Sequence, residues 1–221
     1  MPDITVLTSI TAGKDSLSDD QVAEGATFIA YVSDRAPSAV WEQRDAPNES
    51  SSSRRNSRAP KMLSHRYCDT LHSLWIDGNI SLRVSAPHII REWLKDHDVA
   101  VFKHPERNCI YKEASFCAKR RLDDRAIIGA QVERYRKLGY PRDNGLAECC
   151  CIARRHTAEV KKFNEMWWHE YNNGSVRDQL SFMFAATQSG VRINWISPAA
   201  RRGHPFFEYR QHQTPQPEPA G

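Results

Sequence analysis

Ser73-Leu-Trp-Ile-Asp-Gly-Asn-Ile-Ser-Leu82 is the stretch that decides the fold, because an apolar, β-prone run ends at a polar turn and apolar residues then resume. The run predicts a buried strand, and residues two apart on an extended chain face the same side. The side-chain oxygens of Asp77 and Asn79 are therefore placed to hold one hard cation such as Mg²⁺ or Mn²⁺, with Gly78 leaving room for a diphosphate. The alternative is that Asp-Gly between apolar runs is only a hairpin turn.

The composition is ordinary for a soluble globular protein. The chain has 221 residues, 40% of them apolar and 26% charged, which is enough for one α/β domain with a full core. No apolar run approaches the roughly 18 residues of a membrane span, and the first residues lack the basic start of a signal peptide, so we expect a cytoplasmic protein. The six cysteines match neither a zinc pattern nor a disulfide framework and are expected to be free thiols.

Apolar runs and helical stripes alternate along the chain. Strands are predicted at residues 4–10, 26–32, 74–76, 99–102, 145–153 and 191–196, and helices at 61–67, 87–97, 109–137, 157–171 and 175–188. This alternation predicts an α/β fold with a mostly parallel central sheet in a single domain, residues 1–212, with a flexible loop at 45–58 and a disordered tail at 213–221. Ligands of such sheets bind beyond the carboxyl ends of the strands, where Asp34, Asp77, His104 and Arg154 fall.

Charged residues also lie at predicted helix starts. Asp178 is a candidate base or acceptor-positioning group, although Ser175 and Asp178 together also fit a capping box. Arg58 and Lys61 flank Ala59-Pro60 at a helix N-terminus, where backbone N–H groups and cations together bind phosphate. A solvated basic loop is the alternative for this pair.

Histidines and tryptophans supply further candidates. His204 and His212 carry imidazoles that bind Mn²⁺, although a single histidine is more often a packing or surface residue. His104 and the run Arg154-Arg155-His156 follow predicted strands and are placed to line the cleft. Trp168 is a candidate sugar platform, with core or rim packing as the alternative.

Four segments in a fixed order carry a resemblance to a known family. They are Arg58-Ala-Pro-Lys61 with Ser73–Ile80, His104–Ala114, Asn144–Glu148 with Arg154-Arg-His156, and Met166–Glu170 with Ser175–Phe182. Together they resemble a glycosyltransferase-like family long known only as a domain of unknown function, which occurs in bacteria and in plant proteins linked to cell-wall and mucilage polysaccharides. The resemblance covers residues 4–196.

This resemblance implies a GT-A-like, Rossmann-like nucleotide-binding sandwich. It also implies a metal-dependent glycosyltransferase that uses Mn²⁺ or Mg²⁺ to move a hexosyl or related group from a nucleotide sugar, first of all a UDP-sugar, to a glycan or other hydroxyl acceptor in polysaccharide biosynthesis. Asp77-Gly-Asn79 stands in the place of the family's acidic metal motif, and Asn79 is a weaker ligand than a second aspartate. The resemblance leaves open whether the enzyme inverts or retains the anomeric configuration.

The resemblance also implies roles for individual residues. Asp178, with Arg177, is the expected catalytic pair. The nucleotide sugar is expected on Thr8, Lys14, Asp34, Arg58, Lys61 and Asp77, and the sugar or acceptor on His104, Arg154, His156, Trp168 and Gln179. The expected metal ligands are Asp77 and Asn79, with His204 and His212 as candidates by position.

Two other functions compete with the transferase. A metal-dependent hydrolase would use the same cation to activate water, and a non-catalytic module would bind a nucleotide or sugar without turnover. A nucleic-acid partner is disfavoured because the net charge is only +4 and no recognition motif is present.

Overall fold

The computed structural model describes residues 3–11 and 15–211. Its strands are β1 (Ile4–Ile10), β2 (Thr27–Val32), β3 (Glu42–Asp45), β4 (His72–Ile76), β5 (Ile80–Leu82), β6 (Val99–Lys103), β7 (Ala147–Arg155), β8 (Ile193–Ile196) and β9 (Phe207–Tyr209). Its helices are α1 (Ser53–Asn56), α2 (Ala59–Met62), α3 (Ser64–Tyr67), α4 (Ala86–Leu94), α5 (Ile110–Lys119), α6 (Arg125–Lys137), α7 (Ala158–Asn173) and α8 (Gln179–Ser189), followed by a short 3₁₀ helix, η1 (Ala200–Arg202).

Seven of these strands form one sheet in the order β3-β2-β1-β4-β7-β6-β8. Every neighbouring pair is parallel except the two that involve β7, which runs antiparallel to both β4 and β6. The predicted α/β fold with a mostly parallel sheet is therefore confirmed. Because β7 is reversed, its first residues lie at the same edge as the last residues of β4 and β6.

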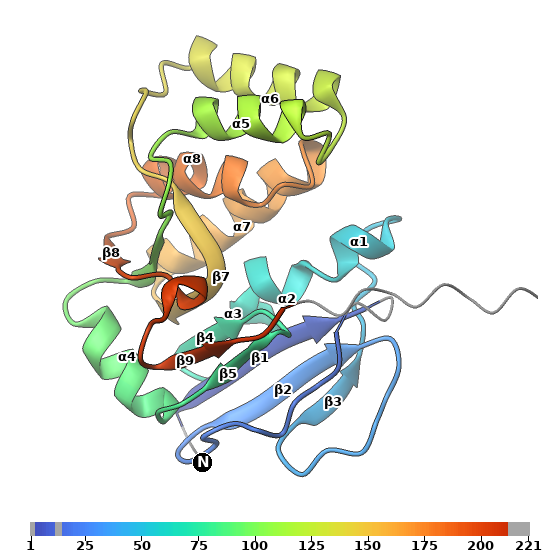
Figure 1. Cartoon of the computed structure of the whole chain (residues 1–221). Coiled ribbons are helices and arrows are strands. Elements are labelled where there is room, and N and C mark those ends of the chain that lie inside the picture. The colour runs from blue at the N-terminus through green and yellow to red at the C-terminus, as the bar shows by residue number, and fades with distance from the viewer. Residues whose placement is uncertain (1–2, 12–14, 212–221) are drawn as a thin grey trace, which may run out of the picture.

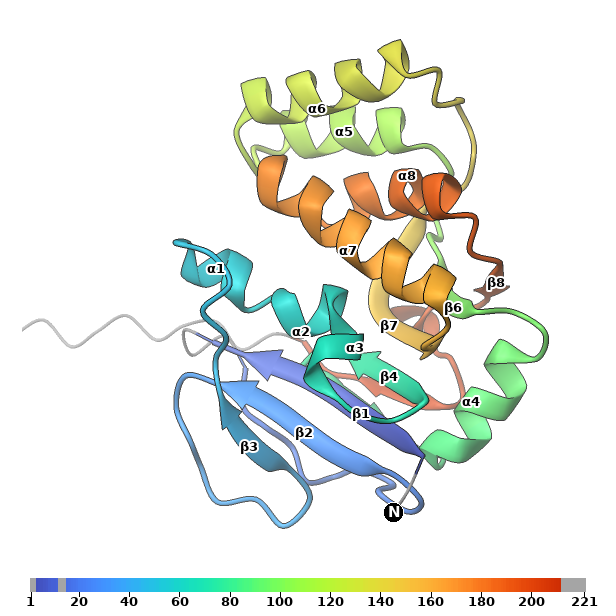
Figure 2. The ribbon, with the colours of Figure 1, turned by 180° about the vertical axis from the view of Figure 1, so that it is seen from behind.

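The central strands are buried on both faces, as expected of a sheet covered by helices. Along β4, Leu74 and Ile76 belong to one apolar core and Trp75 to the other. Helices α2, α3, α7 and α8 cover one face (Figure 2), while α4 and the small β5–β9 sheet cover the other (Figure 1). The hairpin of α5 and α6 lies beyond α8, away from the sheet (Figure 1). None of the helices in the described ranges is long and apolar enough to cross a membrane.

The structure differs from the predicted elements at several points. The predicted helix over 109–137 is two helices, because the chain turns at Arg121, whose φ is +54°, and Asp124 caps α6 by accepting from the N–H groups of Ala126 and Ile127. The segment 45–58, expected to be flexible, contains α1, and Arg55 of that helix donates a hydrogen bond of 2.8 Å to the carbonyl oxygen of Gly174.

The three consecutive cysteines mark an irregularity in β7. Val101 of β6 pairs with Ile152, and the next residue, Phe102, pairs with Glu148, so that the register between the two strands shifts across residues 149–151. All six cysteines are free, as the sequence predicted, and only Cys150 is not buried. The shift allows Cys149 to pack into one core and Cys151 into the other.

Candidate functional site

The site is built around the turn that follows β4. The N–H of Asp77 donates to the carbonyl oxygen of Cys150 at 2.8 Å, which fixes Asp77 at the carboxyl edge of the sheet, and the N–H of Ile80 closes the turn on the carbonyl oxygen of Asp77 at 2.9 Å. A Cβ atom at Gly78 would lie 2.7 Å from Ile10 Cγ1, so a larger residue would force the Ile10 side chain to move. The turn connects the large sheet to β5 of the small sheet and does not join two paired strands, which corrects the hairpin alternative.

Lys61 connects the carboxylates of Asp77 and Asp178. Its Nζ lies 2.6 Å from Asp178 Oδ2 and 3.3 Å from Asp77 Oδ1, and only 3% of the Lys61 side chain is exposed. Burial opposes the charge on Lys61, but the two carboxylates outweigh it and hold the pKa of Lys61 above its ordinary value. Lys61 therefore remains charged at this edge, where it links α2 to the residue that follows β4 and to the N-cap of α8.

Arg58 adds a second cation to this group. Although burial opposes its charge, the carboxylates of Asp77 and Asp178 raise the pKa of Arg58. Arg58 immediately precedes α2, and Pro60 occupies the first turn of that helix. Lys61 is buried and is therefore not part of a solvated basic loop, whereas phosphate binding by Arg58 and Lys61 stays a prediction. Helix α2 is a single turn, so its own N–H groups contribute little.

Asp178 serves two purposes. Oδ1 accepts from the N–H of Gln179 at 2.9 Å and makes Asp178 the N-cap of α8, while Oδ2 accepts from Lys61. Against the effect of burial, Lys61 and then Arg58 lower the pKa of Asp178 to about 2. The capping alternative is thus correct for Asp178 itself, whereas Ser175 donates to Asp123 at 2.6 Å and takes no part in the cap.

The neighbours of Asp178 in the sequence point in different directions. Gln179 Nε2 donates to the carbonyl oxygen of Ala147 at 3.1 Å, which places Gln179 beside the start of β7. The Nε of Arg177 is buried without a hydrogen-bond partner among the described residues. The charge of Arg177 helps to lower the pKa of Asp178, and it also opposes the rise that burial causes in the pKa of the Cys117 thiol. Because Cys117 belongs to α5, Arg177 lies between the site and that helix.

Arg154 and His156, predicted to line the cleft, lie in a buried layer behind it. Arg154 has no exposed surface and donates to the carbonyl oxygen of Lys61 at 2.8 Å and to Ser64 Oγ at 3.0 Å. His156 Nε2 lies 2.9 Å from Ser73 Oγ, and burial lowers the pKa of His156 to about 4. These residues hold α2 and α3 on the sheet, and through them they hold Lys61 in place.

The predicted ligand His204 lies in an aromatic cluster away from Asp77. His204 packs against the rings of Trp93, Phe102 and Phe207, with centroid distances of 5.3–5.6 Å, and its Nδ1 accepts from the N–H of Phe206. His204 is therefore a packing residue, as the alternative held. His212 and Lys14 lie outside the described residues.

The other predicted binding residues are dispersed. Thr8 is buried within β1, and its Oγ1 has no hydrogen-bond partner among the described residues. Asp34 is exposed beyond the end of β2 and accepts from Ser33 Oγ. Trp168 is half-buried on α7 beside Tyr171. His104 is buried after β6, where its Nδ1 accepts from the N–H groups of Glu106 and Arg107.

Asp77 suits a divalent cation that is held mainly through substrate. The hydrogen bonds that Asp77 accepts from described residues, from Trp75 and Lys61, both go to Oδ1, which leaves Oδ2 for a cation. Asn79 is held by its Nδ2, which donates to the carbonyl oxygen of Arg210. No three His, Cys, Asp or Glu side chains gather as ligands in the described part of the chain. Mg²⁺ is often bound by one or two carboxylates together with substrate phosphates and water, and this donor set fits that mode.

Comparison with known proteins identifies the family. The pattern of the TOD1/MUCI70 glycosyltransferase-like domain matches residues 42–197. The chain belongs to this family. It is also 31% identical over 156 residues to a protein of Arabidopsis thaliana named probable hexosyltransferase MUCI70, which covers 66% of this chain and 27% of that protein. The chain thus spans about a quarter of the length of its curated relative.

One solved glycosyltransferase structure supports the fold of this family, and a second is reported beside it. The WbbM bifunctional glycosyltransferase superposes with a TM-score of 0.53 at 9% identity, over 87% of this chain and 38% of that one. The galactosyltransferase LgtC gives a TM-score of 0.46 at 10% identity, over 87% of this chain and 73% of that one. The likeness to WbbM and the sheet order show that this TOD1/MUCI70 domain has a GT-A-like fold, as predicted from the sequence.

Two residues at the edge received no role from the sequence. Arg210 donates from Nη2 to the carbonyl oxygen of Gly78 at 3.1 Å, and only the pairing of β9 with β5 brings it there. Glu148 lies in Asn144–Glu148, one of the segments that carry the family resemblance, but its place at the edge depends on the reversed direction of β7. Strand direction has no local signal in a sequence, so neither residue could be assigned.

Proposed function

We propose that this domain transfers a sugar, first of all a hexose, from a nucleotide-sugar donor to a hydroxyl group of a glycan during polysaccharide assembly. The observation that carries the proposal is the placement of two cations, the buried Lys61 and the half-buried Arg58, beside Asp77 at the carboxyl edge of a GT-A-like sheet. A diphosphate needs positive charge around it, and the family and the name of the Arabidopsis relative favour hexosyl transfer.

The leaving group of this reaction is a nucleoside diphosphate, which gains negative charge as the sugar–phosphate bond breaks. Lys61 and Arg58 are held as cations where that charge would develop, and they need no rearrangement of solvent to stabilise it. A Mg²⁺ or Mn²⁺ ion on Asp77 and Asn79, when bound, would supply further neutralisation of the diphosphate. Thr8 and Asp34 are proposed to contact the base and ribose, and a UDP-sugar is the first donor to test.

Asp178 is better suited to orienting a sugar than to taking a proton. A general base works best when its pKa lies near the working pH, whereas Lys61 and Arg58 hold the pKa of Asp178 at about 2. Its carboxylate therefore stays ionised and accepts hydrogen bonds. We assign Asp178 and its neighbour Gln179 to positioning the donor sugar or the acceptor.

The hydrolase alternative makes a different demand on the protein. A catalytic metal that activates water is usually held by three protein ligands and keeps one open position. The described residues bring no such group of three together at Asp77. The transferase needs fewer protein ligands because its donor supplies phosphate oxygens, and it is the function that the geometry favours.

Thermal unfolding with UDP-, GDP-, CDP- and ADP-linked sugars, each with and without Mn²⁺, tests the proposal. A ligand that binds only the folded state raises the unfolding midpoint. We expect a metal-dependent shift with one nucleotide class, and we expect Asp77→Asn, which keeps the shape of the side chain, to remove the metal dependence and the transfer activity. Unchanged transfer by Asp77→Asn would refute the metal-centred mechanism, and hydrolysis without transfer to any glycan would favour the hydrolase.

A further inference from the structure

Glu148 lies at the same edge of the sheet as Asp77. Because β7 is antiparallel to β4 and β6, Glu148 near its start pairs with Phe102 near the end of β6. The N–H of Asp77 is bonded to the carbonyl oxygen of Cys150, two residues further along β7. Two residues of extended chain span at most about 7 Å, which is close to the width of one hexose. The charge of Asp77 also acts on the Glu148 carboxyl group.

The Glu148 carboxylate is held at one oxygen and unsatisfied at the other. Oε1 accepts from Arg201 Nε at 2.8 Å, whereas Oε2 is buried without a hydrogen-bond partner among the described residues. The residue as a whole is 8% exposed. Burial raises the pKa of Glu148, Asp77 raises it further, and Arg201 and Arg202 oppose this. A buried carboxylate oxygen without a donor is unfavourable, so a ligand donor at that oxygen would bind with a net gain.

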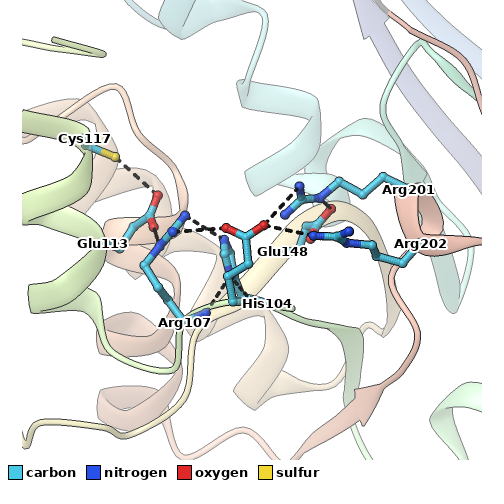
Figure 3. Close-up of polar contacts among 8 residues, drawn as sticks. His104, Arg107, Glu113, Cys117, Glu148, Arg201 and Arg202 are labelled. Atoms are coloured by element: carbon cyan, nitrogen blue, oxygen red, sulfur yellow. Dashed lines mark hydrogen bonds and ion pairs between the residues drawn. The ribbon is translucent and has the colours of Figure 1, made fainter. Parts of the chain in front are cut away.

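The surrounding residues hold this carboxylate through Oε1 and leave the buried Oε2 without a donor among the described residues. Figure 3 shows Glu148 beside Arg201 and Arg202, with His104, Arg107, Glu113 and Cys117 further to the left in the view. Glu106 lies 3.0 Å from Arg202 and 3.3 Å from Arg107, so it joins these two arginines. Arg107 is in turn bound to Glu113 at 2.5 Å. Three carboxylates thus face three guanidinium groups, and Glu148 is the carboxylate of this network that has a buried oxygen left without a donor.

We propose that Glu148 Oε2 accepts a hydrogen bond from a hydroxyl group of the transferred hexose, and that Arg201 positions the carboxylate for this contact. The inference rests on the proposed function, because it requires a sugar that is attached to a diphosphate at Asp77 and extends along the edge toward Glu148. The side chain of Glu148 keeps 11% of its surface exposed. Rotation about the terminal torsion of a glutamate has a low barrier, so a small rotation presents Oε2 to the ligand. Donor sugars that lack the contacted hydroxyl are then rejected.

Calorimetric titration with UDP, UDP-glucose, UDP-galactose and their monodeoxy analogues, in the presence of Mn²⁺, tests this contact. In Glu148→Gln the binding of UDP should remain within twofold of the wild type, while the advantage of the full sugar nucleotide over one deoxy analogue, about 10- to 100-fold for a hydrogen bond to a charged group, should disappear. Glu148→Asp, which keeps the charge but shortens the side chain, should lose the same discrimination.

Glu106→Gln is the matched control, since it removes the same charge from another partner of Arg201 and leaves Glu148 intact. It should keep the discrimination among deoxy analogues. Discrimination that survives in both Glu148 variants while UDP still binds would overturn the assignment of Glu148 and leave the proposed function standing. Failure of the wild type to bind any nucleotide or nucleotide sugar would refute the proposed function itself. Thermal unfolding of each variant distinguishes a loss of ligand binding from a loss of folding.

Discussion

Replacing Lys61 by methionine should destabilise the domain far more than the loss of an exposed ion pair would. The substitution keeps the length and the apolar stem of the side chain but removes the ammonium group that contacts Asp178 and Asp77. Both carboxylates are then left at a mostly buried edge without their main counter-charge. Breaking a buried pair by removing one partner is strongly destabilising because the remaining charge is uncompensated.

The pKa of Asp178 indicates how much stability Lys61→Met should lose. Its value falls from 3.8 to about 2 on folding, with Lys61 as the largest favourable cause. At roughly 1.4 kcal/mol for each tenfold change in proton affinity, this difference contributes about 2 kcal/mol to stability at pH 7. Asp77 adds to the loss, so we expect Lys61→Met to lower the free energy of unfolding by about 2 to 5 kcal/mol.

The pH dependence of this stability difference tests whether the ionised Asp178 carboxylate is its cause. A carboxyl group whose pKa is lowered by folding stabilises the native state above its unfolded pKa of 3.8, and this contribution is lost as the pH falls through about 2. The difference between wild type and Lys61→Met should therefore be constant from pH 7 to about pH 5 and should shrink below pH 3.8.

Urea unfolding, followed by the fluorescence of the buried tryptophans, measures these values. Lys112→Met is the control, because Lys112 makes an ion pair of 2.8 Å with Asp143 but its side chain is 52% exposed. Exposed pairs contribute about 0–1 kcal/mol, so Lys112→Met should change stability little. A loss below 1 kcal/mol for Lys61→Met, or a loss independent of pH down to pH 2, would refute the argument that Lys61 compensates the two carboxylates.

Two further predictions concern the frame of the site. Gly78→Ala places a Cβ atom 2.7 Å from Ile10 Cγ1, so we expect a loss of about 1–3 kcal/mol in urea unfolding together with weaker nucleotide binding, and unchanged stability would contradict the close approach. His156 has a folded pKa of about 4 against an ordinary 6.5, so stability should fall by up to about 3 kcal/mol between pH 6.5 and pH 4 as the unfolded chain takes up the proton first, and His156→Gln should flatten this part of the pH profile.

The parts of the fold with strong local patterns were predictable from the sequence. The apolar runs of β1, β4 and β6 are long enough to identify strands that are buried on both faces, and the stripe along α7 identified that helix. By contrast, β3 has the sequence Glu-Gln-Arg-Asp and lies at the edge of the sheet, where no apolar pattern is needed. Strands β5 and β9 have three residues each, which is too few for a period to be recognised.

A site residue could be predicted only where it directly follows an element that the sequence identifies. Asp77 follows a buried strand directly, so its place at the edge follows from the strand itself. The approach of Lys61 to both carboxylates and the burial of Arg154 depend on how α2 and α3 pack on the sheet. His204 was a candidate ligand by its position near the C-terminus, and only the packing of β9 shows that it belongs to an aromatic cluster.

The contacts that build the edge also join very distant parts of the chain. Lys61 and Asp178 are 117 residues apart in the sequence, and Gly78 and Arg210 are 132 residues apart. During folding, contacts of such separation form only after large loops have closed, and they are slow for that reason. During synthesis from the N-terminus, Lys61 and Asp77 therefore lack Asp178 until almost the whole domain has left the ribosome. A ligand that contacts both Asp77 and Asp178 can bind only the completed fold. The donor would therefore stabilise finished molecules and would contribute little to the folding of nascent chains.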